Sequence, residues 1–400
     1  MAKFETAMNL IYLDNNSTTP LDPVVATAMH ECAVAGLANP ASQHRLGQAA
    51  RRTLEQARES IAAILGGQMV GMRADRLILT SGGTEANNLA LAGLVGTAPP
   101  AGQPPARVIV SAIEHPSVLA AAEALGRSGF EICHLAVTRQ GVADLEHLRN
   151  LLTPETRLVS VMLANHETGV IQPVREIVQL ASEKSVPVHV DAVQAAGKLT
   201  LKFHEWGLAA MTVTPHKFHG PVGIGGLLVR HDVTLNPQTH GGFQQSGLRP
   251  GTEPVALAVG FRVALEQWQA AAAERWQQMQ TLRDQFERTL LADSANIVVQ
   301  GSEAERLPQV SYLSCVGLDR QRLLLALDRA GIACSSGPAC ASGSSQPSPV
   351  LRAMQVPEDQ IRSALRFSVS ARTTLPEVTE ACQRILHVIN DLRLSARTGK

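Results

Sequence analysis

The stretch Thr214-Pro215-His216-Lys217-Phe218-His219-Gly220 decides the interpretation of this chain, because it ends the apolar run 211–214. A second apolar run, 186–190, is followed at once by Asp191. Short apolar runs that end at a polar residue are typical of buried strands in a parallel sheet. The pattern predicts an amine and a carboxylate at the ends of neighbouring strands.

An amine and a carboxylate in this arrangement indicate pyridoxal phosphate chemistry. Lys217 would form a Schiff base with the cofactor, and Asp191 would keep the pyridine nitrogen protonated so that the ring withdraws electrons. Schiff-base chemistry requires a neutral amine, which desolvation favours. The alternatives are a solvated surface position for Lys217 and a helix N-cap for Asp191.

Length and composition restrict the class of protein. The chain has 400 residues, more than one compact core usually holds, so we expect two domains. Its 45% apolar and 18% charged residues are ordinary for a soluble globular protein. The formal net charge is zero, and the longest apolar stretch, 89–98, is too short to span a bilayer. We therefore expect neither a nucleic-acid partner nor a membrane partner.

The cysteines and the N-terminus suggest a cellular compartment. The six cysteines are scattered and show no disulfide-framework spacing. The first twelve residues match neither a signal peptide nor a transit peptide. We expect a reducing cytoplasm and no metal site.

Helix-like and strand-like segments alternate from residue 51 to about 230. This alternation predicts an α/β fold with a mostly parallel, seven-stranded sheet and helices on both faces. Apolar residues then recur at three- and four-residue steps from Phe261 to Leu290, which predicts one long helix joining two domains. The rest of the chain predicts a smaller C-terminal α+β domain. The predicted large domain is 21–255, and the predicted small domain combines 1–20 with 256–400.

Three further sites carry possible chemistry. Gly82-Gly83-Thr84 lies between a strand and a helix start, where backbone N–H groups can bind an anion; a simple chain reversal is the alternative. His115 could stack on a flat ring and move protons, or merely cap a helix. Cys340 lies in the segment 333–349, which is rich in Ser, Gly and Pro and is expected to be a loop.

Ten short motifs occur in an order that resembles the cysteine desulfurases of the class-V aminotransferase superfamily. Examples are His189-Val-Asp-Ala-Val-Gln194 and Ser335-Ser-Gly-Pro-Ala-Cys340. The full set comprises 12–20, 39–42, 81–88, 114–115, 164–169, 189–194, 216–217, 249–252, 335–340 and 365–368. The resemblance extends from Tyr12 to Leu394 and implies the pyridoxal phosphate-dependent transferase fold of type I.

The resemblance also implies a role for each site residue. The catalytic residues would be Cys340 as the sulfur-accepting nucleophile, Lys217 and His115. Arg366 would bind the substrate carboxylate, which suits its bidentate fork, and Asn165 would help to bind substrate. The residues implied to hold the cofactor are Gly83, Thr84, His166, Asp191, Gln194, Thr214, His216, Lys217 and, from the other subunit of a homodimer, Thr252.

The implied reaction removes sulfur from L-cysteine and yields alanine and a persulfide on Cys340. A protein acceptor, such as an iron–sulfur scaffold or a thiolation protein, would then receive the sulfur. The alternatives are a selenocysteine lyase and a sulfur-relay protein that binds the cofactor without efficient turnover. Several positions depart from the family pattern, and two of them lie beside implied site residues. His166 stands where a second asparagine is usual, and Pro215 removes an N–H donor beside the lysine.

Overall fold

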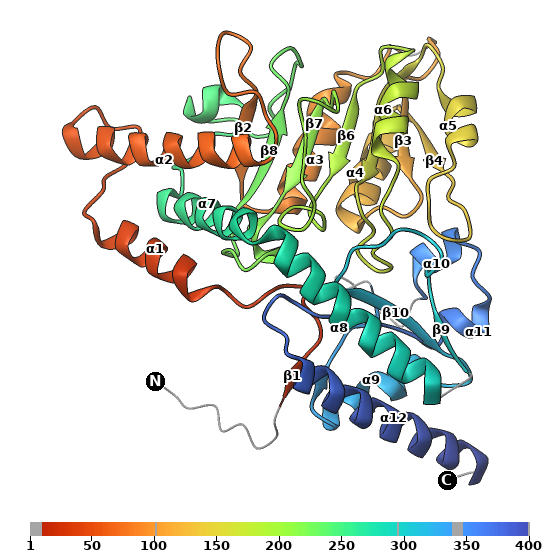
Figure 1. Ribbon diagram of the computed structural model, residues 1–400. Helices are drawn as coiled ribbons and strands as arrows, with labels where there is room; N and C mark the ends of the chain where they lie inside the picture. Colours follow the sequence, from red (N-terminus) through yellow and green to blue (C-terminus); the bar gives the residue numbers. More distant parts are fainter. Residues whose placement is uncertain (1–9, 101, 294–295, 338–346, 399–400) are drawn as a thin grey trace.

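The computed structural model describes residues 10–100, 102–293, 296–337 and 347–398. Cys340 lies outside the described residues. The described chain forms a large part built on a wide sheet and a smaller part that carries the C-terminal helix (Figure 1). The boundaries proposed for the two domains, at 20/21 and 255/256, stay predictions.

Seven strands form the large sheet in the order β2-β8-β7-β6-β5-β3-β4. Their bounds are Arg76–Thr80 (β2), Arg107–Ser111 (β3), Glu131–Leu135 (β4), Thr156–Met162 (β5), Val188–Asp191 (β6), Ala210–Val213 (β7) and Gly225–Val229 (β8). All the strands are parallel except β8, which runs antiparallel to both of its neighbours. The prediction of an α/β fold with a mostly parallel, seven-stranded sheet is confirmed. β8 reverses because a short 3₁₀ turn, η1 (Pro215–Lys217), follows β7 in place of a crossover helix.

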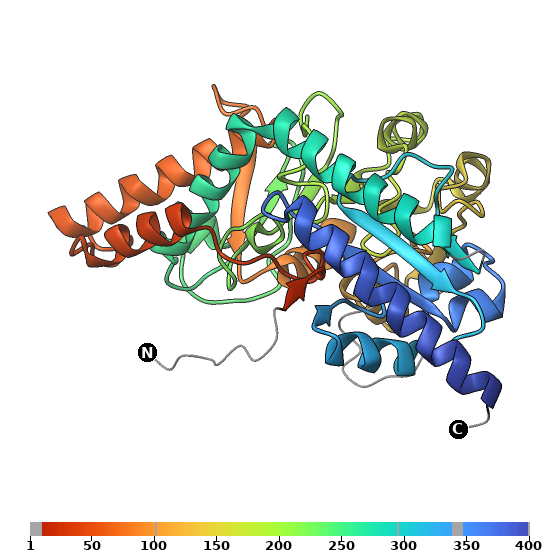
Figure 2. The same cartoon turned by 60° about the horizontal axis from the view of Figure 1, so that its bottom comes forward.

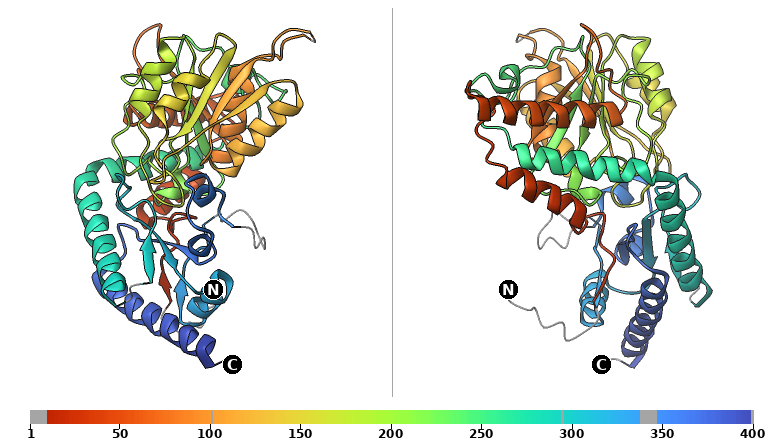
Figure 3. Two further views of the ribbon diagram at one scale, coloured as in Figure 1. Left: turned by 90° about the vertical axis from the view of Figure 1, so that its right-hand side faces the viewer. Right: turned by 60° about the vertical axis from the view of Figure 1, so that its left-hand side comes forward.

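Helices cover both faces of the sheet, because successive side chains of a strand point to opposite faces. Ile109 of β3 belongs to the core that includes α2 (Arg45–Ile64), α5 (Leu145–Leu151), α6 (Val174–Ser182) and α7 (Val255–Ala270). Its neighbours Val108 and Val110 instead pack against α3 (Gly83–Val95) and α4 (Pro116–Arg127). The layers are visible when the molecule is turned about the vertical axis (Figure 3).

The long helix predicted between Phe261 and Leu290 is wrong in one respect: it consists of two helices. α7 ends at Ala270, its C-cap Ala271 leaves the helical region with a φ of −133° and a ψ of 27°, and α8 (Ala272–Asp293) begins next. α7 packs against α2 and α1 (Pro23–Val34), whereas α8 packs against α12 (Leu375–Thr398), so the axis must change direction between the two parts (Figure 3). None of the described helices is both long and apolar enough to cross a membrane.

The smaller part contains two short sheets under α8 and α12 (Figure 2). The antiparallel sheet has the order β12-β10-β9, with bounds Ala364–Ser368, Val310–Cys315 and Ile297–Val299. A parallel pair joins β1 (Ile11–Tyr12) to β11 (Ile332–Ala333). The predicted α+β character of the C-terminal part is therefore confirmed. The chain leaves β1 and returns to the large part through residues 14–20, and this passage brings Asn16 and Ser17 to the carboxyl end of the large sheet.

Candidate active site

A cavity of about 280 Å³ lies at the carboxyl ends of β5, β6 and β7. In parallel sheets these ends form the usual place for a ligand, because loops and helix N-termini converge there. Most of the predicted site residues line the cavity: Gly83, Thr84, His115, His166, Asp191, Gln194, Thr214, His216, Lys217 and Arg366.

Lys217 ends the 3₁₀ turn η1 and extends its amine toward the returning N-terminal segment. Its Nζ donates to the backbone carbonyls of Asn16 and Ser17, each at 2.8 Å. Both acceptors are main-chain atoms of the segment between β1 and α1. The amine is thus held at one defined position in the cavity wall.

Asp191 is the last residue of β6 and is 5% exposed. Its Oδ2 accepts a hydrogen bond of 2.7 Å from Asn87 of α3, and its Oδ1 accepts one of 2.9 Å from the Val193 amide. A buried carboxylate needs such donors to remain ionised. No helix begins directly after Asp191, so Asp191 is not a helix N-cap. Its bond to the Val193 amide instead stabilises the turn that follows β6.

A chain of hydrogen bonds connects Asp191 to His115. Asn87 donates to Ser117 Oγ at 2.9 Å as well as to Asp191, and Ser117 Oγ lies 2.8 Å from His115 Nδ1. His115 is the N-cap of α4, and its Nδ1 accepts from the Ser117 amide at 3.1 Å. Because Nδ1 is an acceptor, the proton of the neutral ring belongs on Nε2.

Burial favours the neutral form of two imidazoles that lie next to each other in the cavity, His115 and His166. Desolvation lowers the pKa of His115, with Lys217 and Arg366 acting in the same direction and Asp191 opposing them. Desolvation places the pKa of His166 well below its ordinary value, and the charges nearby add to this shift. The two rings meet edge to face with centroids 5.4 Å apart. His166 Nδ1 is buried and has no hydrogen-bond partner among the described residues.

Gln194 and Arg366 present further polar atoms around the cavity. Gln194 donates to the Asn16 carbonyl at 3.1 Å, while its buried Oε1 has no partner within the described chain. Arg366 of β12 is 2% exposed and donates to the His166 carbonyl at 2.9 Å. Its Nη2 binds Asp14 Oδ1 at 2.9 Å and Ser17 Oγ at 2.7 Å. A carboxylate that binds Arg366 would therefore compete with Asp14.

The N-terminus of α3 forms the end of the cavity that suits an anion. This helix begins at Gly83 after Gly82, and no described side chain caps it. The N–H groups of the first turn and the positive end of the helix dipole are therefore available to a phosphate. Gly225 makes room here, because a Cβ on it would lie 2.6 Å from the backbone of Gly82.

Two residues predicted to hold the cofactor, Thr214 and His216, have partners within the protein. The Thr214 hydroxyl donates to the Ile224 carbonyl at 3.0 Å. His216 Nδ1 lies 3.2 Å from Thr18 Oγ1. Burial, followed by the charges of Lys217 and Lys198, lowers the pKa of His216 to about 4. A bound dianion would oppose that shift, because an opposite charge favours the protonated ring.

Three predicted site residues do not line this cavity. Asn165 is fully buried, and its Oδ1 accepts from the amides of Glu167 and Thr168, each at 2.9 Å, so its side chain shapes a turn. Thr252 is exposed and lines a separate pocket, in a loop where Arg249 pairs with Glu85 at 2.8 Å. Cys340 lies outside the described residues. The roles assigned to these three residues, like the roles assigned to the residues that line the cavity, stay predictions.

The sequence assigned no role to several polar groups in or beside the cavity, although most of them lie inside the quoted motifs. Asn16 and Ser17 supply the carbonyls for Lys217, and Asn87 joins Asp191 to α4 through Ser117. Glu114 accepts from the Met162 amide at 2.5 Å, and burial, with Asp191 nearby, raises its pKa well above the ordinary value. The sequence could have indicated these residues only by their position close to residues for which it predicted a role.

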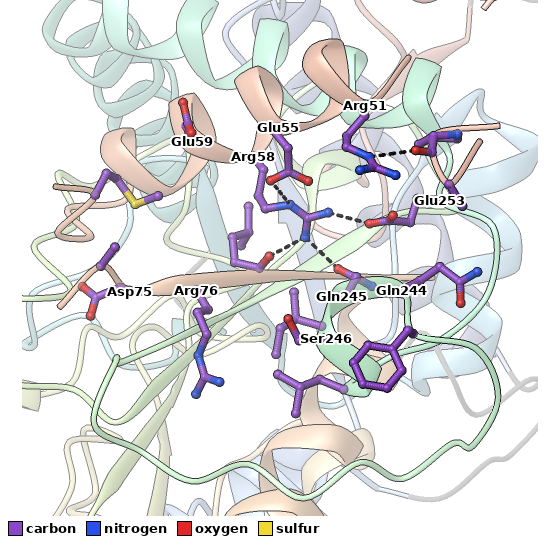
Figure 4. Close-up of a pocket in the computed structure, with 18 residues that line it drawn as sticks. Arg51, Glu55, Arg58, Glu59, Asp75, Arg76, Gln244, Gln245, Ser246 and Glu253 are labelled. Atoms are coloured by element: carbon purple, nitrogen blue, oxygen red, sulfur yellow. Dashed lines mark hydrogen bonds and ion pairs between the residues drawn. The ribbon is translucent and has the colours of Figure 1, made fainter. Parts of the chain in front are cut away.

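A second cavity, of about 680 Å³, lies between α2, β2 and the loop 243–248. Arg58 lies in its centre and points toward Gln245 and Glu253 (Figure 4). None of the predicted site residues that the structure describes lines this cavity. We therefore place the candidate active site in the smaller cavity around Lys217.

Comparisons with known proteins identify the family to which the chain belongs. The model of the Aminotransferase class-V family matches residues 11–380. Cysteine desulfurase IscS of Dictyoglomus turgidum is 35% identical over 383 residues, which cover 96% of this chain and 95% of that protein. Cysteine desulfurase NifS of Azotobacter vinelandii is 34% identical over 383 residues, covering 96% and 93%.

The solved structure of a NifS-like protein from Rickettsia africae superimposes with a TM-score of 0.85 at 28% identity, covering 96% of this chain and 100% of the other. The fold and the site define a class-V aminotransferase, and the chain belongs to this family. The chain matches cysteine desulfurases over almost the whole length of those proteins. The resemblance predicted from the sequence is confirmed, and with it the function class. Enzymes of this family use pyridoxal phosphate.

Proposed function

We propose that this protein is a cysteine desulfurase whose cavity around Lys217 binds pyridoxal 5'-phosphate. The observation that carries the proposal is a single cavity that combines the Lys217 amine, the buried Asp191 carboxylate and the buried Arg366 guanidinium. When bound, the cofactor supplies an electron sink at the α-carbon of an amino acid.

Unpartnered buried atoms support the fit of this cofactor. Gln194 Oε1 and His166 Nδ1 lack partners among the described residues, and buried polar atoms without partners are costly unless a ligand meets them. The uncapped start of α3 would hold the phosphate, together with Thr84 and His216. Asp191 would face the pyridine nitrogen, whose positive charge would compensate the buried carboxylate.

The roles of the side chains follow from their positions. Arg366 would bind the substrate carboxylate, exchanging its contact with Asp14 for a new one of the same kind. Lys217 Nζ, displaced from the cofactor by the substrate amine, would remove the α-proton of cysteine. The Cys340 thiolate would then attack the substrate sulfur: an S–S bond forms, and the C–S bond breaks with its electron pair left on the substrate carbon. Protonation of Cβ and return of a proton to Cα would then give alanine.

His115 would present its Nε2–H to the substrate. The capping bond at Nδ1 favours this donor role, because accepting a proton at Nδ1 would break the cap of α4. The link through Ser117 and Asn87 would fix the position of the His115 ring relative to Asp191. Proton transfer by His115, as the sequence suggested, would require this cap to open.

The remaining assignments concern partners. We propose a homodimer in which Thr252 of one subunit contacts the phosphate held by the other, since Thr252 does not line the cavity of its own chain. We further propose a cytoplasmic protein that passes sulfur to an iron–sulfur scaffold or a thiolation protein. The names IscS and NifS among the relatives support the first of these acceptors.

The test is the release of alanine and sulfide from L-cysteine, with a reductant, by the wild type and by Cys340→Ala. Cys133→Ala is the matched control, because this half-buried cysteine lies on β4, away from the cavity. We expect Cys340→Ala to lose desulfuration and Cys133→Ala to retain it. Full activity in Cys340→Ala would contradict the proposal. A preference for L-selenocysteine with negligible turnover of L-cysteine would favour a selenocysteine lyase instead.

A further inference from the structure

The three consecutive backbone carbonyls of the lysine turn are each held by a different donor. The amide and hydroxyl of Thr19 bind the His216 carbonyl at 2.9 and 3.0 Å. Trp268 Nε1 of α7 binds the Phe218 carbonyl at 3.2 Å. Between them, Nζ of Lys198 binds the Lys217 carbonyl at 3.1 Å. Only the carbonyl of Lys217 itself is bound by a side-chain ammonium group.

The segment that carries Lys198 is built to lie against this turn. Gly197 has a φ of +70°, and a Cβ on it would lie 2.6 Å from the Phe218 side chain, so only glycine allows this approach. The same segment begins with Asp191 and includes Gln194, both of which line the cavity. One short stretch therefore supplies two cavity groups and a cation behind Lys217.

The electrostatic surroundings of Lys198 are unusual for a lysine. The side chain is half-buried, and desolvation, followed by the charge of Lys217, lowers the pKa of Lys198 to about 7. The charge of Lys198 in turn helps to lower the pKa of His216 and His219. Asp22 acts on His219 in the opposite sense. The amines of Lys198 and Lys217 thus affect each other electrostatically.

We propose that Lys198 is a positioning residue for Lys217. Its amine holds the Lys217 carbonyl at 3.1 Å, and in its protonated form its charge lowers the affinity of the Lys217 nitrogen for a proton, because like charges disfavour each other. This inference rests on the proposed function, in which Lys217 carries the cofactor and must become a neutral base. The sequence offered no sign of it, because a lysine at position 198 resembles any surface lysine.

The experiment titrates the absorbance of the holoenzyme against pH in the wild type, Lys198→Met and Lys198→Arg. We expect the midpoint of the absorbance change to rise by about one pH unit in Lys198→Met, where the neighbouring charge is lost. Lys198→Arg keeps the charge and should restore the wild-type midpoint. Lys202→Met is the matched control, since Lys202 lies close in sequence but is half exposed and pairs with Glu205 at 2.9 Å.

A midpoint in Lys198→Met equal to that of the wild type and of Lys202→Met would overturn the inference. An equal shift in Lys198→Arg and Lys198→Met would overturn the part assigned to charge. If Lys198→Met does not fold, as judged by its thermal unfolding, Lys198→Gln is titrated with the same criteria. Lys217→Ala distinguishes failure of the proposed function from failure of this inference. If Lys217→Ala keeps the absorbance band of the wild-type holoenzyme, both the role of Lys217 and this inference fail. If it loses the band while Lys198→Met is unchanged, only this inference fails.

Discussion

The two cavities around Lys217 and Arg58 differ in how their polar groups are satisfied. In the larger cavity, the Nη atoms of Arg58 bind the Leu77 carbonyl at 2.7 Å, Gln245 Oε1 at 2.8 Å and Glu253 at 2.5 Å. Its buried Nε makes no hydrogen bond among the described residues but pairs with the Glu55 carboxylate at 3.2 Å. In the smaller cavity, buried atoms of His166, Gln194 and Arg366 lack hydrogen-bond partners among the described residues.

This difference separates a structural network from a binding site better than volume does. Arg58 is surrounded by protein groups that use its charge, so the network stabilises the fold at the edge of the sheet. The cavity around Lys217 contains buried polar atoms without hydrogen-bond partners among the described residues. Such atoms lower the stability of the fold, and a ligand that binds them would offset this loss. Substitutions in the first cavity should therefore affect stability, and those in the second should affect activity.

The largest expected effect is on catalysis. Asp191→Asn removes the charge that would hold the pyridine nitrogen protonated, so we expect kcat for alanine formation to fall by roughly 10³-fold. The amide oxygen can still accept from the Val193 N–H, but the new NH2 would face the NH2 of Asn87, whose amide must turn over to accept from it. We therefore expect the free energy of unfolding to fall by about 1 kcal/mol, far too little to explain the loss of activity. Steady-state kinetics on cofactor-loaded protein measure this effect. Activity within tenfold of the wild type would contradict the role of Asp191.

The opposite result is expected in the larger cavity. Arg58→Met leaves Glu253, whose side chain is 12% exposed, without its cation, and we expect the free energy of unfolding to fall by about 3 kcal/mol. Activity per folded molecule should be unchanged. Arg175→Met is the control, because Arg175 is 69% exposed and its pair with Glu205 at 3.4 Å should contribute less than about 0.5 kcal/mol. Equal effects in both variants, measured by denaturant unfolding, would contradict the distinction.

A pH effect should arise in the strand layer beneath the Lys217 cavity. His189 of β6 is fully buried between Ser160 and Thr212, and desolvation lowers its pKa from 6.5 to about 3. Below pH 6.5 the imidazole of residue 189 therefore binds a proton in the unfolded chain but not in the folded chain, so the free energy of unfolding decreases as the pH falls. Between pH 7 and pH 5 this term amounts to about 2 kcal/mol.

His189→Asn removes this titration. Its free energy of unfolding should change by about 2 kcal/mol less than that of the wild type over the same pH interval. Urea unfolding at the two pH values measures the difference. Parallel pH dependence in the two proteins would show that another group is responsible.

The smallest expected effect concerns the edge strand beside Arg58. The Gln245 amide accepts from the Leu79 N–H at 2.7 Å and donates to the Leu79 carbonyl at 2.9 Å, in the manner of a neighbouring strand. Gln245→Glu keeps the acceptor and loses the donor, so we expect about 1 kcal/mol of destabilisation. Chemical denaturation detects a change of this size. A variant as stable as the wild type would show that this donor contributes nothing to the edge.

The sequence predicted the fold where the local pattern determines the structure. Apolar runs of strand length mark all seven strands of the large sheet, and their spacing by helices indicates a parallel arrangement. The antiparallel direction of β8 was missed, because the turn after β7 carries Lys217 and has no separate signal for direction. The break at Ala271 was missed as well, because the helical periodicity continues through it and only packing on two different parts bends the axis.

The same limit applies to the site. Lys217 and Asp191 could be predicted because polar residues directly after apolar runs belong at one edge of a sheet. The acceptors of the Lys217 amine could not be predicted, because they are backbone carbonyls of Asn16 and Ser17, and any residue carries a carbonyl. The contact from Lys198 depends on the close approach that Gly197 allows, which appears only in three dimensions.

The central claim is that Lys217 carries the cofactor in the smaller cavity. Borohydride reduction of the cofactor-loaded protein turns the C=N bond to the lysine into a stable C–N bond, and mass spectrometry of the digested protein then locates the modified lysine. The account predicts modification of Lys217, with Lys198, Lys184 and Lys202 unmodified. Modification of Lys198 or of any other lysine in place of Lys217 would contradict it.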